Sequence, residues 1–181
     1  ENNFDKVIEA LPLVLEKIPD VIYLIAGSGE IKEYLERLVR NLNIVDKVIF
    51  AGYISEREKI AFYNACDIFI MPSRVLPGDV EGFGIVFLEA NACGKPVIGG
   101  NTGGIVDAIV DGATGYLVNP LDHKEIAEKI IKLLSNKRLA ERLGQNGRER
   151  VKEKFNCRKN AERILSLART LVMKKDLRTE N

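Results

Sequence analysis

The chain has 181 residues, of which 46% are hydrophobic and 29% are charged, which is typical of a folded globular domain and excludes a disordered tail or a coiled coil. Its 27 lysines and arginines against 26 aspartates and glutamates leave no charge excess that would favour binding to nucleic acid or to an anionic membrane. Three widely spaced cysteines form no CxxC pair, and no apolar run approaches the roughly 20 residues of a membrane span. These features predict a reduced, cytoplasmic protein without a disulfide framework or a zinc site.

Short β-branched runs alternate with longer segments of helical periodicity, a pattern that predicts a Rossmann-like parallel sheet with helices on both faces. Strands are expected at residues 21–26, 47–51, 67–71, 96–99 and 115–118. Helices are expected at residues 4–18, 31–42, 56–65, 84–92, 105–110, 124–134, 137–154 and 157–172. No linker or internal repeat divides the sequence, so residues 1–181 are predicted to form a single α/β domain.

Two of the expected helices have strong start signals. Ser55 precedes Glu58 by three residues, which predicts a capping box, and Asp122 and Glu125 repeat the arrangement with aspartate as the cap. Ligands of open parallel sheets bind outside the carboxyl ends of the strands. Function is therefore expected in the loops that follow residues 26, 51, 71 and 99.

The glycine-rich segment 72–104 is the most informative part of the chain. Gly82 and Gly84 lead directly into a helical pattern, and such a turn offers free backbone N–H groups together with the positive end of a helix dipole. This predicts an anion site, for which a diphosphate is the obvious candidate. Glu81 and Glu89 flank the turn, where their carboxylates could accept hydrogen bonds from sugar hydroxyls. Either glutamate alone would suit a solvated surface, but the combination with the glycines favours a binding site.

The segment from Glu81 to Glu89 resembles the E-x7-E donor-binding signature of GT-B glycosyltransferases of family 4. Segments 20–29, 48–54, 65–73 and 111–120 are similar to family segments in the same order. The resemblance implies a chain that is the C-terminal half of a GT-B fold, with the N-terminal acceptor domain lying outside it. It also implies a retaining hexosyltransferase that takes a nucleotide-diphosphate sugar. The sequences of segments 79–82 and 88–94 are similar to those of mannosyltransferases that use GDP-mannose, and UDP-sugars remain open as donors.

The same resemblance assigns roles to individual residues. Glu81 would contact the donor sugar at the catalytic centre, and Glu89 would bind the ribose hydroxyls. The backbone N–H groups of the next residues would bind sugar and diphosphate, namely Phe83, Gly84, Ile85 and Val86. Tyr53 and Ile54 would contact the base. Gly27 and Gly29 are further candidates near the nucleotide, although a plain strand-to-helix turn explains them equally well.

The chemistry implied by the family needs no protein nucleophile, because the leaving phosphate oxygen helps to deprotonate the acceptor on the same face. No metal and no other cofactor are expected. The family places an Arg–Lys pair beside the leaving diphosphate, and its Lys would fall near Glu1 or Asn2, so the pair is upstream or absent. The isolated domain is expected to bind its donor and to be inactive without the N-terminal domain. Attachment of the full-length enzyme to the inner membrane face stays open.

Two alternatives share the predicted architecture. A sugar-nucleotide epimerase would have a similar diphosphate site, but it predicts catalytic acids that this sequence does not reveal. A non-catalytic nucleotide-binding module is the other alternative. Binding of a dinucleotide is disfavoured because segment 27–32 has two glycines where a GxGxxG turn needs three. Asn101 and Thr102 follow an expected strand and are weaker candidates for the border of a sugar pocket.

Overall fold

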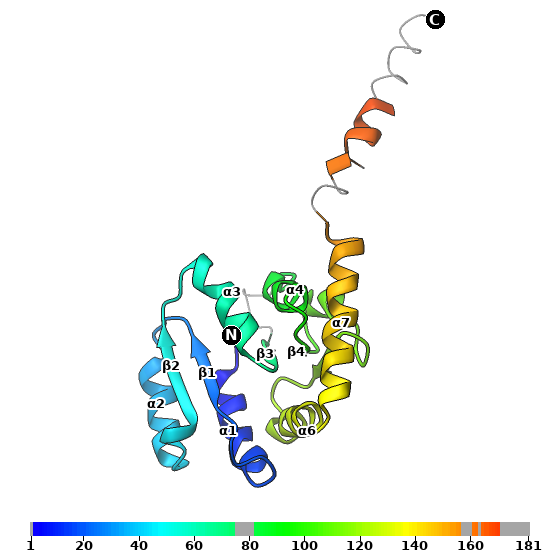
Figure 1. Ribbon diagram of the computed structural model, residues 1–181. Helices are drawn as coiled ribbons and strands as arrows, with labels where there is room; N and C mark the ends of the chain where they lie inside the picture. The colour runs from blue at the N-terminus through cyan, green and yellow to red at the C-terminus, as the bar shows by residue number, and fades with distance from the viewer. Residues whose placement is uncertain (1, 75–81, 157–160, 163, 171–181) are drawn as a thin grey trace, which may run out of the picture.

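The computed structural model describes residues 2–74, 82–156, 161–162 and 164–170. Helices and strands alternate along the chain, as the sequence predicts, and Figure 1 shows their arrangement. The elements are α1 (Phe4–Leu15), β1 (Tyr23–Ala26), α2 (Lys32–Asn41), the 3₁₀ turn η1 (Val45–Lys47), β2 (Val48–Gly52), α3 (Glu56–Ala65), β3 (Phe69–Met71), α4 (Ile85–Ala92), β4 (Val97–Gly100), α5 (Ile105–Ala108), β5 (Gly115–Val118), α6 (His123–Leu134) and α7 (Lys137–Lys154).

The described strands are all parallel, which confirms the predicted α/β class, but they form two hydrogen-bonded sheets instead of one. β1 pairs with β2, and β4 lies between β3 and β5. Among the described residues, no strand pairing therefore joins β1 to β3.

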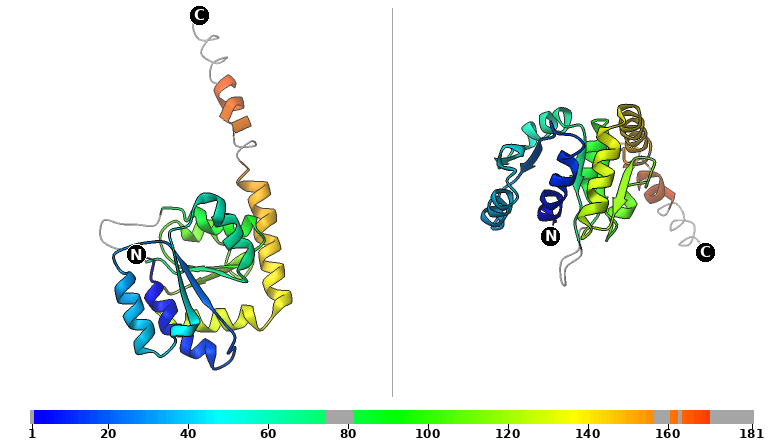
Figure 2. Two further views of the ribbon diagram at one scale, coloured as in Figure 1. Left: turned by 60° about the vertical axis from the view of Figure 1, so that its left-hand side comes forward. Right: turned by 90° about the horizontal axis from the view of Figure 1, so that it is seen from below.

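β4 shows how the larger sheet is covered by helices on both faces. Val97 and Ile98 are adjacent and fully buried, but they belong to different hydrophobic clusters. Successive side chains of a strand point to opposite faces, so one cluster lies on each side of the sheet. Val97 packs with residues of α4 and α5, while Ile98 packs with residues of α1 and α6. Figures 1 and 2 show these helices around the strands.

Several elements are shorter than the sequence predicts, each for a local reason. α1 stops at Leu15 because Ile18 precedes Pro19, and a residue before proline disfavours the helical conformation. β1 begins at Tyr23 because its partner β2 begins only at Val48, after η1. Residues 161–162 and 164–170 are helical, as expected, and stand away from the sheets (Figure 1). The other positions of that predicted last helix lie outside the described residues.

Asn3 fixes the beginning of α1 at the carboxyl edge of the larger sheet. Its buried side chain donates through Nδ2 to the carbonyl oxygens of Pro72 at 2.9 Å and of Pro120 at 3.0 Å. These two prolines follow β3 and β5. The edge where ligands of parallel sheets bind is therefore held by contacts between distant segments. Among the described residues, no helix has the length and apolar character needed to cross a lipid bilayer.

Candidate functional site

The N-terminus of α4 is open, and a glycine makes it so. Gly84 is the N-cap residue, adopts a φ of 70°, and leaves the helix without a side-chain cap. A Cβ at this position would lie 2.6 Å from Cδ2 of the buried Phe87 ring, so the turn requires glycine. Within the described part of the chain, no acceptor is recorded for the backbone N–H groups of Ile85 and Val86. The first turn of α4 thus offers free donors and the positive end of its dipole.

The N-terminus of α3 is closed by the predicted capping box. The Glu58 amide donates to Ser55 Oγ at 3.3 Å, and the Ser55 amide donates to the Glu58 carboxylate at 2.8 Å. The Ser55 hydroxyl also donates to Glu58 Oε2 at 2.6 Å. This bond is the largest cause that lowers the pKa of the Glu58 carboxyl, and the bond from the Ser55 amide is the second. Of the two helices that follow β2 and β3, α3 therefore has a start occupied by its own side chains, and α4 has a start that is free.

The loop predicted to contact a nucleotide base lies next to the glycine turn predicted to lie near the nucleotide. Tyr53, which is 80% exposed, and Ile54 come directly before the Ser55 cap. The Gly27 amide donates to the carbonyl oxygen of Gly52 at 2.7 Å, so the turn after β1 touches the loop after β2. The structure thus brings Gly27 next to the Tyr53–Ile54 loop, and its φ of 129° needs a glycine there.

Glu89 lies in the second turn of α4, as the sequence predicts, and its side chain is held by α3. Its Oε2 accepts a hydrogen bond from the Tyr63 hydroxyl at 2.9 Å. Lys59 Nζ lies 3.3 Å from Oε2 and 3.4 Å from Oε1. Because α3 also follows the Tyr53–Ile54 loop, this one helix connects the candidate base contacts to the candidate ribose contact. Sequence reasoning missed Lys59 and Tyr63, although their spacing of four places both on one helix face.

Two further predicted site residues, Glu81 and Phe83, have no side chain that the structure places at the site. Glu81 lies outside the described residues. Phe83 packs its ring against Phe155, with ring centroids 5.6 Å apart, so its side chain faces the end of α7 and leaves only its backbone for a ligand. Gly104 packs against the carbonyl of Gly82, where a Cβ would collide with the carbonyl oxygen. The start of α5 thus supports the turn that leads into α4.

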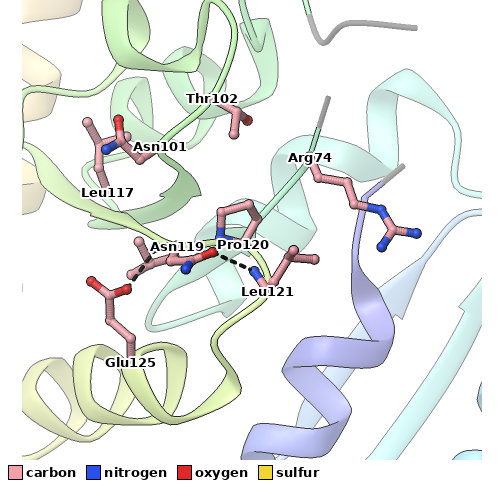
Figure 3. A pocket seen from close by; sticks show the side chains of 9 residues that line it. Arg74, Asn101, Thr102, Leu117, Asn119, Pro120, Leu121 and Glu125 are labelled. Carbon is pink, nitrogen blue, oxygen red and sulfur yellow. Dashed lines mark hydrogen bonds between the residues drawn. The ribbon is translucent and has the colours of Figure 1, made fainter. Parts of the chain in front are cut away.

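A cavity of about 600 Å³ lies at the same edge, between the loops that follow β3, β4 and β5 (Figure 3). Asn101 and Thr102 line it, and Thr102 donates to the Ser73 carbonyl at 2.9 Å. Their place at the border of a sugar pocket stays a prediction. Arg74 and Asn119 also line it and were missed by sequence reasoning. Asn119 directly follows β5, and Arg74 lies in the loop after β3, so their positions after strand ends were the available signal.

At the wall of this cavity, the predicted capping box of Asp122 and Glu125 is only half formed. Asp122 caps α6 through the amides of Lys124 and Glu125, as expected. The Glu125 carboxylate, however, accepts from the Asn119 amide at 2.8 Å and not from Asp122 (Figure 3). The Asn119 side chain in turn accepts from the Leu121 amide at 3.0 Å. The loop before α6 therefore competes for the carboxylate that a capping box would use.

Lys6, the lysine nearest to the predicted position of the basic pair, is already paired with Glu9. Both oxygens of the Glu9 carboxylate accept from Lys6 Nζ, at 2.8 and 2.6 Å. The bond to Glu9 is the largest cause that raises the pKa of Lys6. In the described ranges, no three His, Cys, Asp or Glu side chains gather as a metal site.

Solved structures of other proteins share the fold of this chain. The C-terminal domain of a glycosyl transferase group 1 family protein, LpcC from Francisella tularensis, superposes with a TM-score of 0.75 at 31% identity, covering 86% of this chain and 80% of that one. TarM from Staphylococcus aureus, solved with fondaparinux, alpha-GlcNAc-glycerol and UDP, gives a TM-score of 0.81 at 27% identity over 92% of this chain and 32% of TarM. The architecture is thus that of GT-B glycosyltransferases.

The sequence comparisons agree. The model for glycosyl transferases group 1 matches residues 1–150, and the chain belongs to this family. A GDP-mannose-dependent alpha-(1-6)-phosphatidylinositol monomannoside mannosyltransferase from Mycolicibacterium smegmatis is 36% identical over 165 residues. The match covers 90% of this chain and 43% of that relative, so the chain spans less than half of the relative's length.

Proposed function

We propose that this chain is the C-terminal, donor-binding domain of a retaining GT-B hexosyltransferase that takes a nucleotide-diphosphate sugar. The observation that carries the proposal is the open N-terminus of α4, with Glu89 following in its second turn and the Tyr53–Ile54 loop nearby. The similarity to the C-terminal domain from F. tularensis supports the domain assignment. The names of the relatives support GDP-mannose or a UDP-sugar as donor.

The proposed roles follow the arrangement of the donors and acceptors. The amides of Gly84, Ile85 and Val86 and the dipole of α4 bind the diphosphate, since an uncapped helix N-terminus attracts anions. Glu89 accepts from the ribose hydroxyls, and Tyr53 and Ile54 contact the base. Phe83 contributes its backbone, Gly27 and Gly29 border the nucleotide, and Glu81 contacts the donor sugar.

Transfer then proceeds with retention on the face from which the diphosphate leaves. The bond between the anomeric carbon and the diphosphate oxygen breaks, and a bond from that carbon to the acceptor oxygen forms on the same face. The proton of the acceptor hydroxyl goes to the departing diphosphate oxygen. Within this chain the contribution is electrostatic, because the α4 amides stabilise negative charge that grows on the diphosphate. We propose no metal and no further cofactor, and an N-terminal domain supplies the acceptor site. A cytoplasmic location stays a prediction.

Calorimetric titration of the 181-residue chain tests the proposal. GDP-mannose, UDP-glucose, UDP-N-acetylglucosamine, GDP and UDP are compared, with NAD as the control ligand. One sugar nucleotide and its nucleoside diphosphate should bind, and Glu89→Gln should weaken both about tenfold by removing a charged acceptor. Glu81→Gln should weaken only the sugar nucleotide.

Glu128→Gln is the matched control, because Glu128 is an exposed glutamate of α6 that pairs with Lys129 at 3.1 Å. It should leave every affinity unchanged. Binding of none of the sugar nucleotides, or equal binding of NAD, would contradict the proposed function.

A further inference from the structure

Glu89 of α4 forms a small polar cluster with Lys59 and Tyr63 of α3. The two oxygens of its carboxylate are hydrogen-bonded to different extents. The Glu89 side chain is 33% exposed, and its Oε2 takes the short bond from Tyr63. Among the described residues, Oε1 receives only the 3.4 Å contact from Lys59. A carboxylate oxygen has two lone pairs, so Oε1 keeps acceptor capacity for hydroxyl groups of a ligand.

Tyr63 is anchored on the side away from this carboxylate. Its side chain is 7% exposed, and its ring meets Phe69 edge-on at 5.5 Å, while Phe69 meets Phe87 in the same way at 5.6 Å. Phe87 is the ring against which Gly84 packs. The aromatic chain therefore fixes the Tyr63 hydroxyl relative to the open end of α4. Burial, and then the neighbouring Glu89, raise the pKa of Tyr63, so the hydroxyl remains a donor at neutral pH.

Lys59 adds a cation that is shared between two carboxylates. Its ammonium lies 2.9 Å from Glu56 and 3.3 Å from Glu89, and its side chain is 24% exposed. The hydrogen bond to Glu56 is the largest cause that raises the pKa of Lys59. The lysine thus stays charged beside Glu89, whereas Glu56 is exposed to solvent.

We propose that Tyr63 and Lys59 are positioning residues that orient the Glu89 carboxylate and thereby make the site select ribose over deoxyribose. The proposal rests on the proposed function, since it requires that Glu89 faces the ribose of a bound nucleotide. Tyr63 occupies Oε2 and holds the carboxylate in one orientation, which directs Oε1 to the ribose hydroxyls. Lys59 contacts both oxygens of the carboxylate and limits its rotation. Neither residue touches the reacting atoms.

The test measures selectivity for ribose and not affinity alone. UDP and GDP are titrated into the 181-residue chain beside their 2′-deoxy and 3′-deoxy forms, and the ratio of dissociation constants is taken. For the unaltered chain at least one deoxy form should bind about tenfold more weakly. Tyr63→Phe, which keeps the ring packing against Phe69, should reduce this ratio about threefold while the affinity for the deoxy form stays constant.

Three further variants separate the charge of Lys59 from its shape. Lys59→Met keeps the apolar stem and should also lower the ratio, and Lys59→Arg should restore it. Glu56→Gln removes the other partner of Lys59 and should leave the ratio unchanged. An unchanged ratio in Tyr63→Phe, or an equal loss for ribose and deoxyribose forms, would overturn the inference alone. Failure of the unaltered chain to bind any nucleoside diphosphate would overturn the proposed function itself.

Discussion

α3 and α4 begin at the carboxyl ends of parallel strands, but their N-termini are built in opposite ways. α3 starts at Ser55, whose side chain and that of Glu58 occupy the first amides and the cap. α4 starts at Gly84, which has no side chain and cannot be replaced by a larger residue without striking Phe87. The first arrangement stabilises a helix by itself, whereas the second leaves donors free for a ligand. The difference teaches that the same topological position serves stability in one helix and binding in the other.

The largest expected effect is that of Gly84→Ala. The residue would enter the left-handed region with a φ of 70° and would also collide with the Phe87 ring, so the free energy of unfolding should fall by about 3 kcal/mol. Urea unfolding measures this change. Gly112→Ala is the matched control, because Gly112 has a φ of 69° but open space around its missing Cβ. It should cost about 1 kcal/mol. Equal losses in both variants would show that Phe87 does not enforce the glycine.

A smaller loss is expected from Asn3→Ala at the start of α1. The substitution leaves the carbonyls of Pro72 and Pro120 without their donor, so stability should fall by about 2 kcal/mol in urea unfolding. Asn43→Ala serves as the control, because Asn43 has a φ of 55° and Asn3 a φ of 47°. If both variants lost the same amount, the backbone conformation and not the two hydrogen bonds would explain the effect.

Ser55→Ala should remove the cap of α3 and lower the free energy of unfolding by about 1 kcal/mol. Affinity for UDP and GDP should not change, because the account places the diphosphate at α4. Thermal unfolding and titration measure the two quantities separately. Ser55→Asp, which supplies another good cap, should restore the stability. A loss of nucleotide affinity in Ser55→Ala would mean that α3 also binds the ligand.

The smallest expected effect concerns acid. The pKa of Glu58 is lowered in the folded chain by its bonds with Ser55, so its contribution to stability is complete above the ordinary pKa of about 4.3. That contribution is lost as the pH falls through the lower, folded pKa. Glu58→Gln should therefore show a shallower loss of stability between neutral pH and pH of about 3 than the unaltered chain. Indistinguishable slopes in urea unfolding at several pH values would contradict this role of the capping box.

Local features of the fold could be predicted because they depend on neighbouring residues. The Ser55 cap, the helix start after Gly84 and the place of Glu89 in its second turn all follow from spacings of a few residues. The division of the sheet between β1 and β3 could not be derived in this way, because it depends on which strands meet in space. The prediction of a second capping box at Asp122 was wrong for a similar reason, since the Glu125 carboxylate accepts a hydrogen bond from the Asn119 amide instead.

The contacts of the site that could not be predicted from the sequence are mainly those between residues far apart in the chain. The bond from Tyr63 to Glu89 spans 26 residues, and the bonds from Asn3 span 69 and 117. Nothing in the local pattern of α3 indicates that Lys59 and Tyr63 meet a carboxylate of α4. Sequence thus indicates which residues carry the chemistry, and packing determines which residues hold them in place.

Amide chemical shifts of the first helical turns test the central claim most directly. The 181-residue chain, labelled with ¹⁵N, is titrated with UDP and GDP and, separately, with uridine and guanosine, which lack the diphosphate. The account predicts that the amides of Gly84, Ile85 and Val86 shift with a nucleoside diphosphate and not with its nucleoside, while those of Glu56 and Arg57 in α3 show no diphosphate-dependent shift. Diphosphate-dependent shifts at α3 or at the cavity beside Asn119, with the α4 amides unmoved, would contradict it.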